Sequence, residues 1–237
     1  MTGEYGTNSL TVAQVRQEAS TVFLAKVFNW MAIGLGLTGI VAFLTASSGL
    51  AMTIVASPLF FILILAELGM VFYLSFRVEK IQAGTATGLF IGYSVLNGLT
   101  LSSIFLAYTA ASIAGTFFIT AGMFGAMAIY GLVTKRDLSA MGSFLFMGLI
   151  GIILASIVNI FLHSSSLYWT ISVIGVLVFV GLTAWDVQKL KNMGEQGIME
   201  QGEAAVRKGS IIGALALYLD FINLFLMLLR FFGGARD

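Results

Sequence analysis

The residues of this chain that are best placed to do chemistry are carboxylates inside long apolar stretches. Asp220 lies in the middle of ALALYLDFINLFLMLLR, residues 214–230, where no neighbour in the sequence can neutralise it. An ionised aspartate at the centre of a membrane helix costs about 2.5–3.5 kcal/mol, so such a residue faces a bundle interior or water and usually has a partner. Asp220 is therefore the strongest functional candidate in the sequence.

Asp186, in GLTAWDVQKLK, is the natural partner for Asp220. The stretches that carry the two aspartates are joined on the side near Asp186, so the carboxyl groups can come within hydrogen-bonding range. Two carboxylates in contact cannot both ionise cheaply, and we therefore expect them to share a proton. An ordinary interfacial carboxylate near Lys189 is the alternative reading of Asp186. Asn223 lies on the same helical face as Asp220 and makes that face polar.

Glu67 is a third buried carboxylate candidate, in LILAELGMVFYLSFR. It lies about ten residues from a helix end marked by Arg77, at a depth like that of the aspartate in the last stretch. Arg77 either snorkels to the interface, which is the usual behaviour, or reaches inward to a carboxylate. Tyr93, Asn97 and Thr100 form a polar stripe on the next apolar stretch, and we expect this stripe to line the same interior.

The composition defines the elements that must position these residues. Of 237 residues, 59% are hydrophobic and 10% are charged, whereas soluble domains carry roughly 25% charged residues. Apolar stretches of about 20 residues match the thickness of a bilayer core, and the short alternating segments of a β-barrel are absent. The sequence therefore predicts an all-α integral membrane protein. A net charge of +1 leaves no field to attract nucleic acid, and without cysteine there are no thiolate metal sites or disulfides.

Seven transmembrane helices are predicted, with residues 1–26 as a polar cytoplasmic N-terminus and 27–237 as a single transmembrane domain. The expected spans are 27–46, 54–76, 85–107, 111–133, 141–162, 168–188 and 210–232. Ten of the twelve Lys and Arg residues fall on one side of this arrangement, which places the N-terminus in the cytoplasm and the C-terminus outside. Arg230 and Arg236 are discordant, and they leave a re-entrant last helix open as an alternative.

Other motifs favour packing over chemistry. GLGLTG, residues 34–39, matches a dinucleotide fingerprint but lies in a membrane span rather than between a strand and a helix. Gly84 to Gly92 and Gly209 to Gly213 repeat glycine every four residues, which indicates close helix approach. His163 is the only histidine; it cannot build a typical zinc site alone, and we interpret it as an interfacial or helix-end residue.

An enzyme is the less favoured class. Two aspartates on adjacent membrane helices have the chemistry of an intramembrane aspartyl protease, because a carboxyl pair that shares a proton is an acid and a base together. Those proteases carry Tyr-Asp and Gly-x-Gly-Asp motifs, whereas this chain has AWD and LYLD. Nothing marks a serine as a nucleophile either. We therefore expect no catalytic residues and no cofactor.

Four stretches resemble signatures of the transmembrane Bax inhibitor motif family, also called the Bax inhibitor-1 family. They are GLTLSSIF, TKRDLS, GLTAWDVQKLKNMGEQ and GALALYLDFINLFLMLLR. The resemblance covers nearly the whole chain and is closest to the bacterial inner-membrane branch. It implies seven helices with the last one central among the other six. It also implies a calcium leak that responds to pH through an aspartate pair, whose positions here are Asp186 and Asp220. By span position, Arg77 would engage the pair and Glu67 would line the ion path.

The chemistry of the residues agrees with that implication. Calcium takes oxygen ligands, and a leak needs weak binding, so Asp186 and Asp220 would hold the ion only transiently while Glu67, Asn97 and Asn223 line its path. The alternative function is a regulatory membrane protein that binds a membrane protease or another partner without transport. The expected partners are the lipid bilayer, calcium and, in the alternative, that protease. The expected location is the bacterial inner membrane, with the N-terminus cytoplasmic and the C-terminus periplasmic.

Overall fold

The computed structural model describes the backbone of residues 4–234 and the side chains of residues 14–234. This part of the chain is helical and contains no β-strand, and seven of its helices are long and apolar enough to cross a membrane. The predicted fold class is therefore confirmed. The elements are α1 Glu4–Ser47, α2 Leu50–Val55, α3 Leu59–Arg77, α4 Ala83–Leu101, α5 Ile104–Ala107, α6 Ala110–Val133, α7 Ser139–Leu162, α8 Ser165–Glu195, the 3-10 turn η1 Ile198–Glu200, and α9 Glu203–Phe232.

Two of the expected spans are broken. The helix predicted over 54–76 is interrupted before Pro58, which stands at the start of α3, because proline lacks the N–H that a continuous helix needs. The span predicted over 85–107 is found as Ala83–Ala107, but its helix is interrupted after Leu101, between α4 and α5. There the hydroxyls of Ser102 and Ser103 donate to backbone carbonyls three residues earlier, and such local bonds compete with helix continuation.

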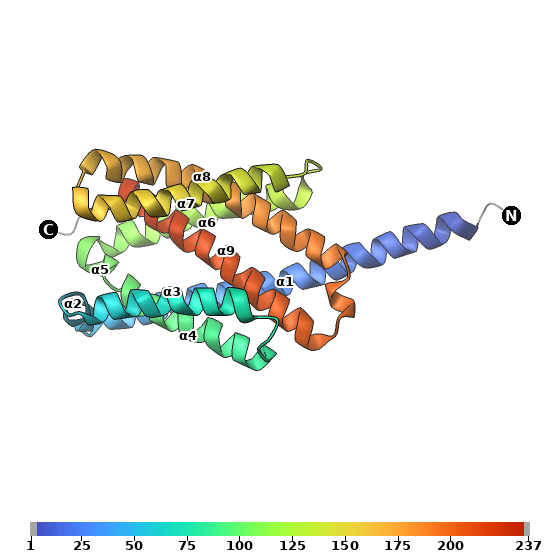
Figure 1. Ribbon diagram of the computed structural model, residues 1–237, viewed down its shortest axis with the longest axis horizontal. Helices are drawn as coiled ribbons and strands as arrows, with labels where there is room; N and C mark the ends of the chain where they lie inside the picture. The colour runs from blue at the N-terminus through green and yellow to red at the C-terminus, as the bar shows by residue number, and fades with distance from the viewer. Residues whose placement is uncertain (1–3, 235–237) are drawn as a thin grey trace.

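Two other segments are more helical than expected. Residues 4–26, predicted as a polar N-terminus, continue α1, which projects beyond the bundle in Figure 1. The polar residues 189–209, between the expected spans 168–188 and 210–232, are mostly helical, because α8 runs to Glu195 and α9 begins at Glu203. The remaining connection turns sharply at Gly197 and Gly202, both with φ of 88°, a conformation that favours glycine.

Helix α9 is the centre of the bundle. In its most apolar stretch 72% of the residues are buried, against 6% in α7. Figure 1 shows α9 running obliquely through the molecule, and its main neighbours are α1, α4, α6 and α8. Helices α3 and α7 pack mainly on α4 and α8 respectively. The last helix therefore meets a surface of protein on most sides, which is where a polar side chain of a membrane helix can be accommodated.

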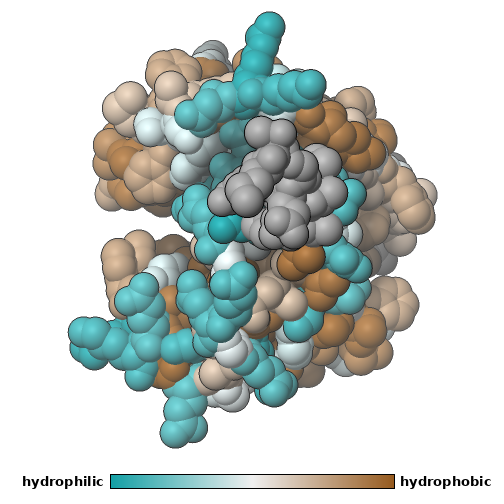
Figure 2. All heavy atoms as spheres, turned by 90° about the vertical axis from the view of Figure 1, so that its right-hand side faces the viewer, coloured by the Kyte–Doolittle hydropathy of each residue, from teal (hydrophilic) through white to brown (hydrophobic). Residues whose placement is uncertain are grey.

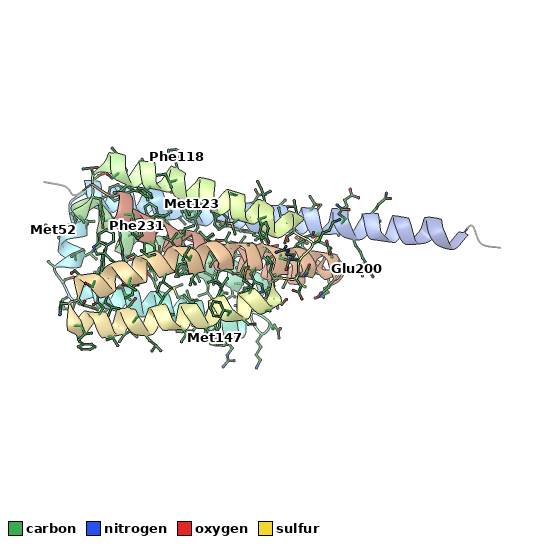
Figure 3. The ribbon with its side chains drawn as sticks, turned by 90° about the horizontal axis from the view of Figure 1, so that it is seen from above. Met52, Phe118, Met123, Met147, Glu200 and Phe231 are labelled. Carbon is green, nitrogen blue, oxygen red and sulfur yellow. The ribbon has the colours of Figure 1, made fainter. Side chains whose placement is uncertain are left out.

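The outer surface of the bundle is apolar. Phe118 on α6 is 74% exposed and Met147 on α7 is 62% exposed, and Figure 3 shows the two pointing away from opposite sides of the molecule. Large exposed apolar side chains on every outer helix suit contact with lipid chains rather than water.

The two ends of the bundle differ in charge. We call the end from which α1 projects the basic end; it carries the connections α3–α4, α6–α7 and α8–α9 (Figure 1). Figure 2 faces this end, and hydrophilic side chains cover much of it, with an indentation on one side. In Figure 3, Glu200 lies at the basic end, while Met52 and Phe231 lie at the opposite one.

Helix α9 runs from the basic end to the opposite end without a break. Its 30 residues span about 45 Å at 1.5 Å per residue. The re-entrant alternative is therefore not the arrangement of this structure. Arg230, one of the two residues that suggested it, donates to Ser172 Oγ at 3.1 Å and stacks 4.3 Å from the centre of the Tyr168 ring. Arg236 lies outside the described residues.

Candidate functional site

Asp186 and Asp220 come together between α8 and α9. Asp220 is 5% exposed and Asp186 is partly exposed, and the two carboxyl groups lie within hydrogen-bonding reach of each other. Helix α9 approaches α8 closely because Gly213 has no side chain; a Cβ there would be 2.6 Å from Leu190 Cδ2. Within the described residues, Asp220 Oδ2 is buried and has no hydrogen-bond partner. Burial without a partner is costly for a carboxylate, and less so for an acid that shares a proton.

A cavity of about 480 Å³ leads to this pair from the basic end. Its walls come from the connection that follows α3, from α8, from η1 and from α9. Asp186 lines it, and its innermost residue on α9 is Ala216, one turn before Asp220. Asp186 therefore faces the cavity while Asp220 lies behind it.

The mouth of the cavity carries charges of both signs. Lys189 and Lys208 line it together with Glu79. Lys189 Nζ lies 5.1 Å from the centre of the Trp185 ring, and Lys208 Nζ donates to the Glu79 backbone oxygen at 2.8 Å. The second contact joins α9 to the connection between α3 and α4. The positive charge of Lys189 interacts electrostatically with the Asp186 carboxyl group.

The structure does not bring Arg77 to the aspartate pair. Arg77 is exposed in the last turn of α3, and in the described part of the chain it makes no hydrogen bond or ion pair with Asp186 or Asp220. A long side chain at a helix end keeps its charge in water when it can. Of the two alternatives that the sequence left open for Arg77, the structure therefore shows snorkelling rather than contact with a carboxylate.

A second polar cluster lies on the other side of α9. Glu67 on α3 accepts a hydrogen bond from Thr100 Oγ1 at 2.8 Å and one from Asn97 Nδ2 at 3.1 Å. The Asn97 Oδ1 atom accepts from the hydroxyl of Tyr218 at 3.1 Å. That hydroxyl lies 2.6 Å from Thr38 Oγ1 on α1. Glu67 and Asn97, predicted to line one interior, are thus in contact.

In the described part of the chain, the Asn223 side chain makes no hydrogen bond to either cluster. Its Nδ2 donates to the Leu219 backbone oxygen at 2.8 Å, within α9 itself. His163 is the residue that ends α7, in a left-handed conformation with φ of 49°. Its interpretation as a helix-end residue is confirmed.

Sequence reasoning missed Tyr218 and Thr38. Both are buried, Tyr218 completely, and both make hydrogen bonds between helices that are far apart in sequence. The available signal was a phenol two residues before Asp220 and a threonine inside the glycine-rich stretch 34–39. Two residues along a helix turn a side chain by about 200°, so Tyr218 and Asp220 point to different neighbours.

Within the described residues no group of three or more His, Cys, Asp or Glu side chains is assembled that could hold a metal ion. The aspartate pair lies between α8 and α9, whereas Glu67 on α3 is linked to α9 only through Asn97 and Tyr218, so the carboxyl groups form separate clusters.

Apolar outer helices around a central helix with two polar faces define a helical membrane protein whose polar groups are enclosed within the bundle. The chain belongs to the Bax inhibitor-1 family: the family model described as "Inhibitor of apoptosis-promoting Bax1" matches residues 20–237. The resemblance seen in the sequence is thereby confirmed.

Curated relatives cover almost the whole chain. The inner membrane protein YbhL of Escherichia coli K12 is 56% identical over 228 residues, which are 95% of this chain and 97% of that protein. A Deinococcus radiodurans protein is 47% identical over 98% of this chain and 96% of its own length. A Rickettsia prowazekii protein is also 47% identical, over 91% of this chain and 90% of its own.

Proposed function

We propose that this protein is a pH-sensitive calcium leak channel of the bacterial inner membrane, with Asp186 and Asp220 as its sensor. One observation carries the proposal: two carboxyl groups from adjacent helices meet at the inner end of a cavity that enters from the basic end. Buried carboxylates in a membrane bundle mark ion pathways or proton relays.

The proposed gate is a change in the contact between α8 and α9. A shared proton bridges the two carboxyl groups and holds the helices together. Loss of that proton leaves two negative charges in contact, which repel each other and attract a cation. The pair is then a two-state element whose balance follows pH. Calcium would be held there by two carboxylates only, weakly enough to leave again.

The proposed ion path continues along the polar faces of the bundle, with Glu67, Asn97 and Asn223 as its lining. The basic end is assigned to the cytoplasm, because Lys and Arg accumulate on the cytoplasmic side of membrane proteins. The proposed location in an inner membrane is supported by the Escherichia coli relative, which is named an inner membrane protein.

The alternative is a regulator that binds a membrane protease or another partner without transport. It is favoured by the projection of α1 beyond the bundle at the basic end (Figure 1), where residues 14–18 are exposed. An exposed helical segment of this kind is available to a partner.

Calcium flux into liposomes that contain only the purified protein separates the two functions. The leak proposal predicts flux above empty liposomes, changing with pH, and lower flux in Glu67→Gln with folding retained. Glu18→Gln is the matched control, because Glu18 is an exposed carboxylate on the part of α1 that projects beyond the bundle and it does not line the cavity. Absence of flux, combined with capture of a membrane protease from native membranes, would replace the leak with the regulatory function. Normal flux in Glu67→Gln would remove Glu67 from the path.

A further inference from the structure

The polar cluster that contains Glu67 has one hydrogen too few for its contacts. Four contacts link five groups in series: Glu67 to Asn97 at 3.1 Å, Asn97 to Tyr218 at 3.1 Å, Tyr218 to Thr38 at 2.6 Å, and Thr38 to the Ser94 backbone oxygen at 2.8 Å. We call this series the polar chain. Asn97 donates to Glu67, Tyr218 to Asn97 and Thr38 to Ser94. The hydroxyls of Tyr218 and Thr38 each have a single hydrogen, so their mutual contact is left without one.

A half-turn of the Asn97 amide removes this shortage. The amide nitrogen and oxygen exchange places with little movement of heavy atoms. The nitrogen then donates to Tyr218, which donates to Thr38, which donates to Ser94. Every contact from Asn97 to Ser94 then has its own hydrogen, and each group donates to the next one in the series. The Asn97 oxygen faces Glu67 Oε2 in this orientation, and two acceptors in contact repel unless one carries a proton.

We propose that Glu67 carries a proton, which it donates to Asn97, and that Thr38 and Tyr218 hold it there by orienting the Asn97 amide. Thr38 and Tyr218 are positioning residues, since neither hydroxyl touches Glu67. The polar chain therefore joins α3 to α1 through α4 and the central helix. The direction in which its amide and hydroxyl groups donate depends on whether Glu67 is protonated. This inference concerns a resting state of the bundle and does not depend on calcium passing through it.

Other placements of the proton do not complete the polar chain. Thr100 Oγ1 lies 2.8 Å from Glu67 Oε1, and a proton on that oxygen leaves the contact between Tyr218 and Thr38 without a hydrogen. No charged side chain occurs on α4, the helix against which α3 mainly packs. The other titratable groups facing Glu67 are the phenols of Tyr93 and Tyr218. Among the described residues no Lys or Arg side chain forms an ion pair with Glu67, which agrees with a neutral acid.

Infrared difference spectroscopy tests the proposal on the purified full chain in lipid bilayers at neutral pH. Wild type minus Glu67→Gln should show the C=O band of a carboxylic acid, and carboxylate bands alone would overturn the proposal. In Thr38→Val, Tyr218 loses its acceptor on α1 and turns its hydrogen to the Asn97 oxygen. The amide nitrogen then faces Glu67, and the acid band should be lost. Thr38 lies on α1, and its hydroxyl is linked to Glu67 only through Tyr218 and Asn97 in the polar chain.

Matched variants separate orientation from general disturbance. Thr38→Ser keeps the hydroxyl and should restore the acid band, whereas Thr45→Val changes a buried threonine on the same helix outside the polar chain and should leave the band intact. Tyr218→Phe retains the ring packing against Phe90 and Tyr93 and should lose the band, while Tyr93→Phe should keep it. Thermal melting identifies variants that fail to fold. An acid band that persists in folded Thr38→Val and Tyr218→Phe contradicts the proposal.

Discussion

Asp220→Asn should remove most of the pH dependence of calcium flux. Asp220 lies about 26 Å from the start of α9 and about 18 Å from its end, at 1.5 Å per residue, and it is 5% exposed. It is thus near the middle of the span, where an ionised aspartate costs about 2.5–3.5 kcal/mol. At 1.36 kcal/mol per factor of ten, that cost corresponds to roughly 70- to 400-fold in a two-state equilibrium.

This magnitude sets the expected results. In wild type, flux should change by up to about a hundredfold between acidic and mildly alkaline pH, because the free energy of ionising the pair biases the gate. Asp220→Asn keeps the shape of the side chain but cannot ionise, so its flux should change by less than about threefold. Asp186→Asn should give the same flat profile, and the double variant should add little, since residues in contact are not additive.

The assay is calcium flux in liposomes at a series of pH values, with protein folding checked in each preparation. Asp137→Asn is the control, because Asp137 lies in the exposed connection between α6 and α7. Hydrogen bonds from the Ser139 hydroxyl and backbone N–H lower the pKa of Asp137, so it stays ionised over the range tested and its substitution should leave the profile unchanged. Additive effects of the two pair substitutions, or an unaltered profile in either, would falsify the shared-proton sensor.

Two further predictions concern topology and packing. A reporter fused at Gly197 should be cytoplasmic and one fused after Asp237 periplasmic, by the positive-inside bias; a cytoplasmic C-terminal reporter would contradict the seven-span topology. Gly131→Ala should lower the stability of the protein by about 1–3 kcal/mol, because its Cβ would clash with the Ala184 backbone oxygen. Gly115→Ala, where a Cβ meets open space, is the control, and equal melting temperatures of the two variants would refute the packing argument.

Much of the aspartate site could be anticipated because its signals are local. An ionisable residue in an apolar stretch stands out in the sequence, and the short connection between α8 and α9 keeps Asp186 and Asp220 on neighbouring helices. The stripe containing Asn97 follows from helical periodicity alone. The spacing of glycines predicted close contacts between helices less well. Gly209 and Gly213 do face close neighbours, but a Cβ at Gly84 or Gly88 would meet nothing within 4 Å.

The sequence by itself determined the class of protein, the number of spans and the carboxylates that matter, because hydropathy and helical period act over a few turns. Only the tertiary structure decided which polar groups meet. Thr38 and Tyr218 are separated by 180 residues, and nothing in either segment specifies the other. Arg77 was within reach of the pair by span position, yet it lies exposed at the end of α3. Contacts between distant helices depend on how each helix is rotated and tilted in the bundle, and packing against all neighbours sets both at once.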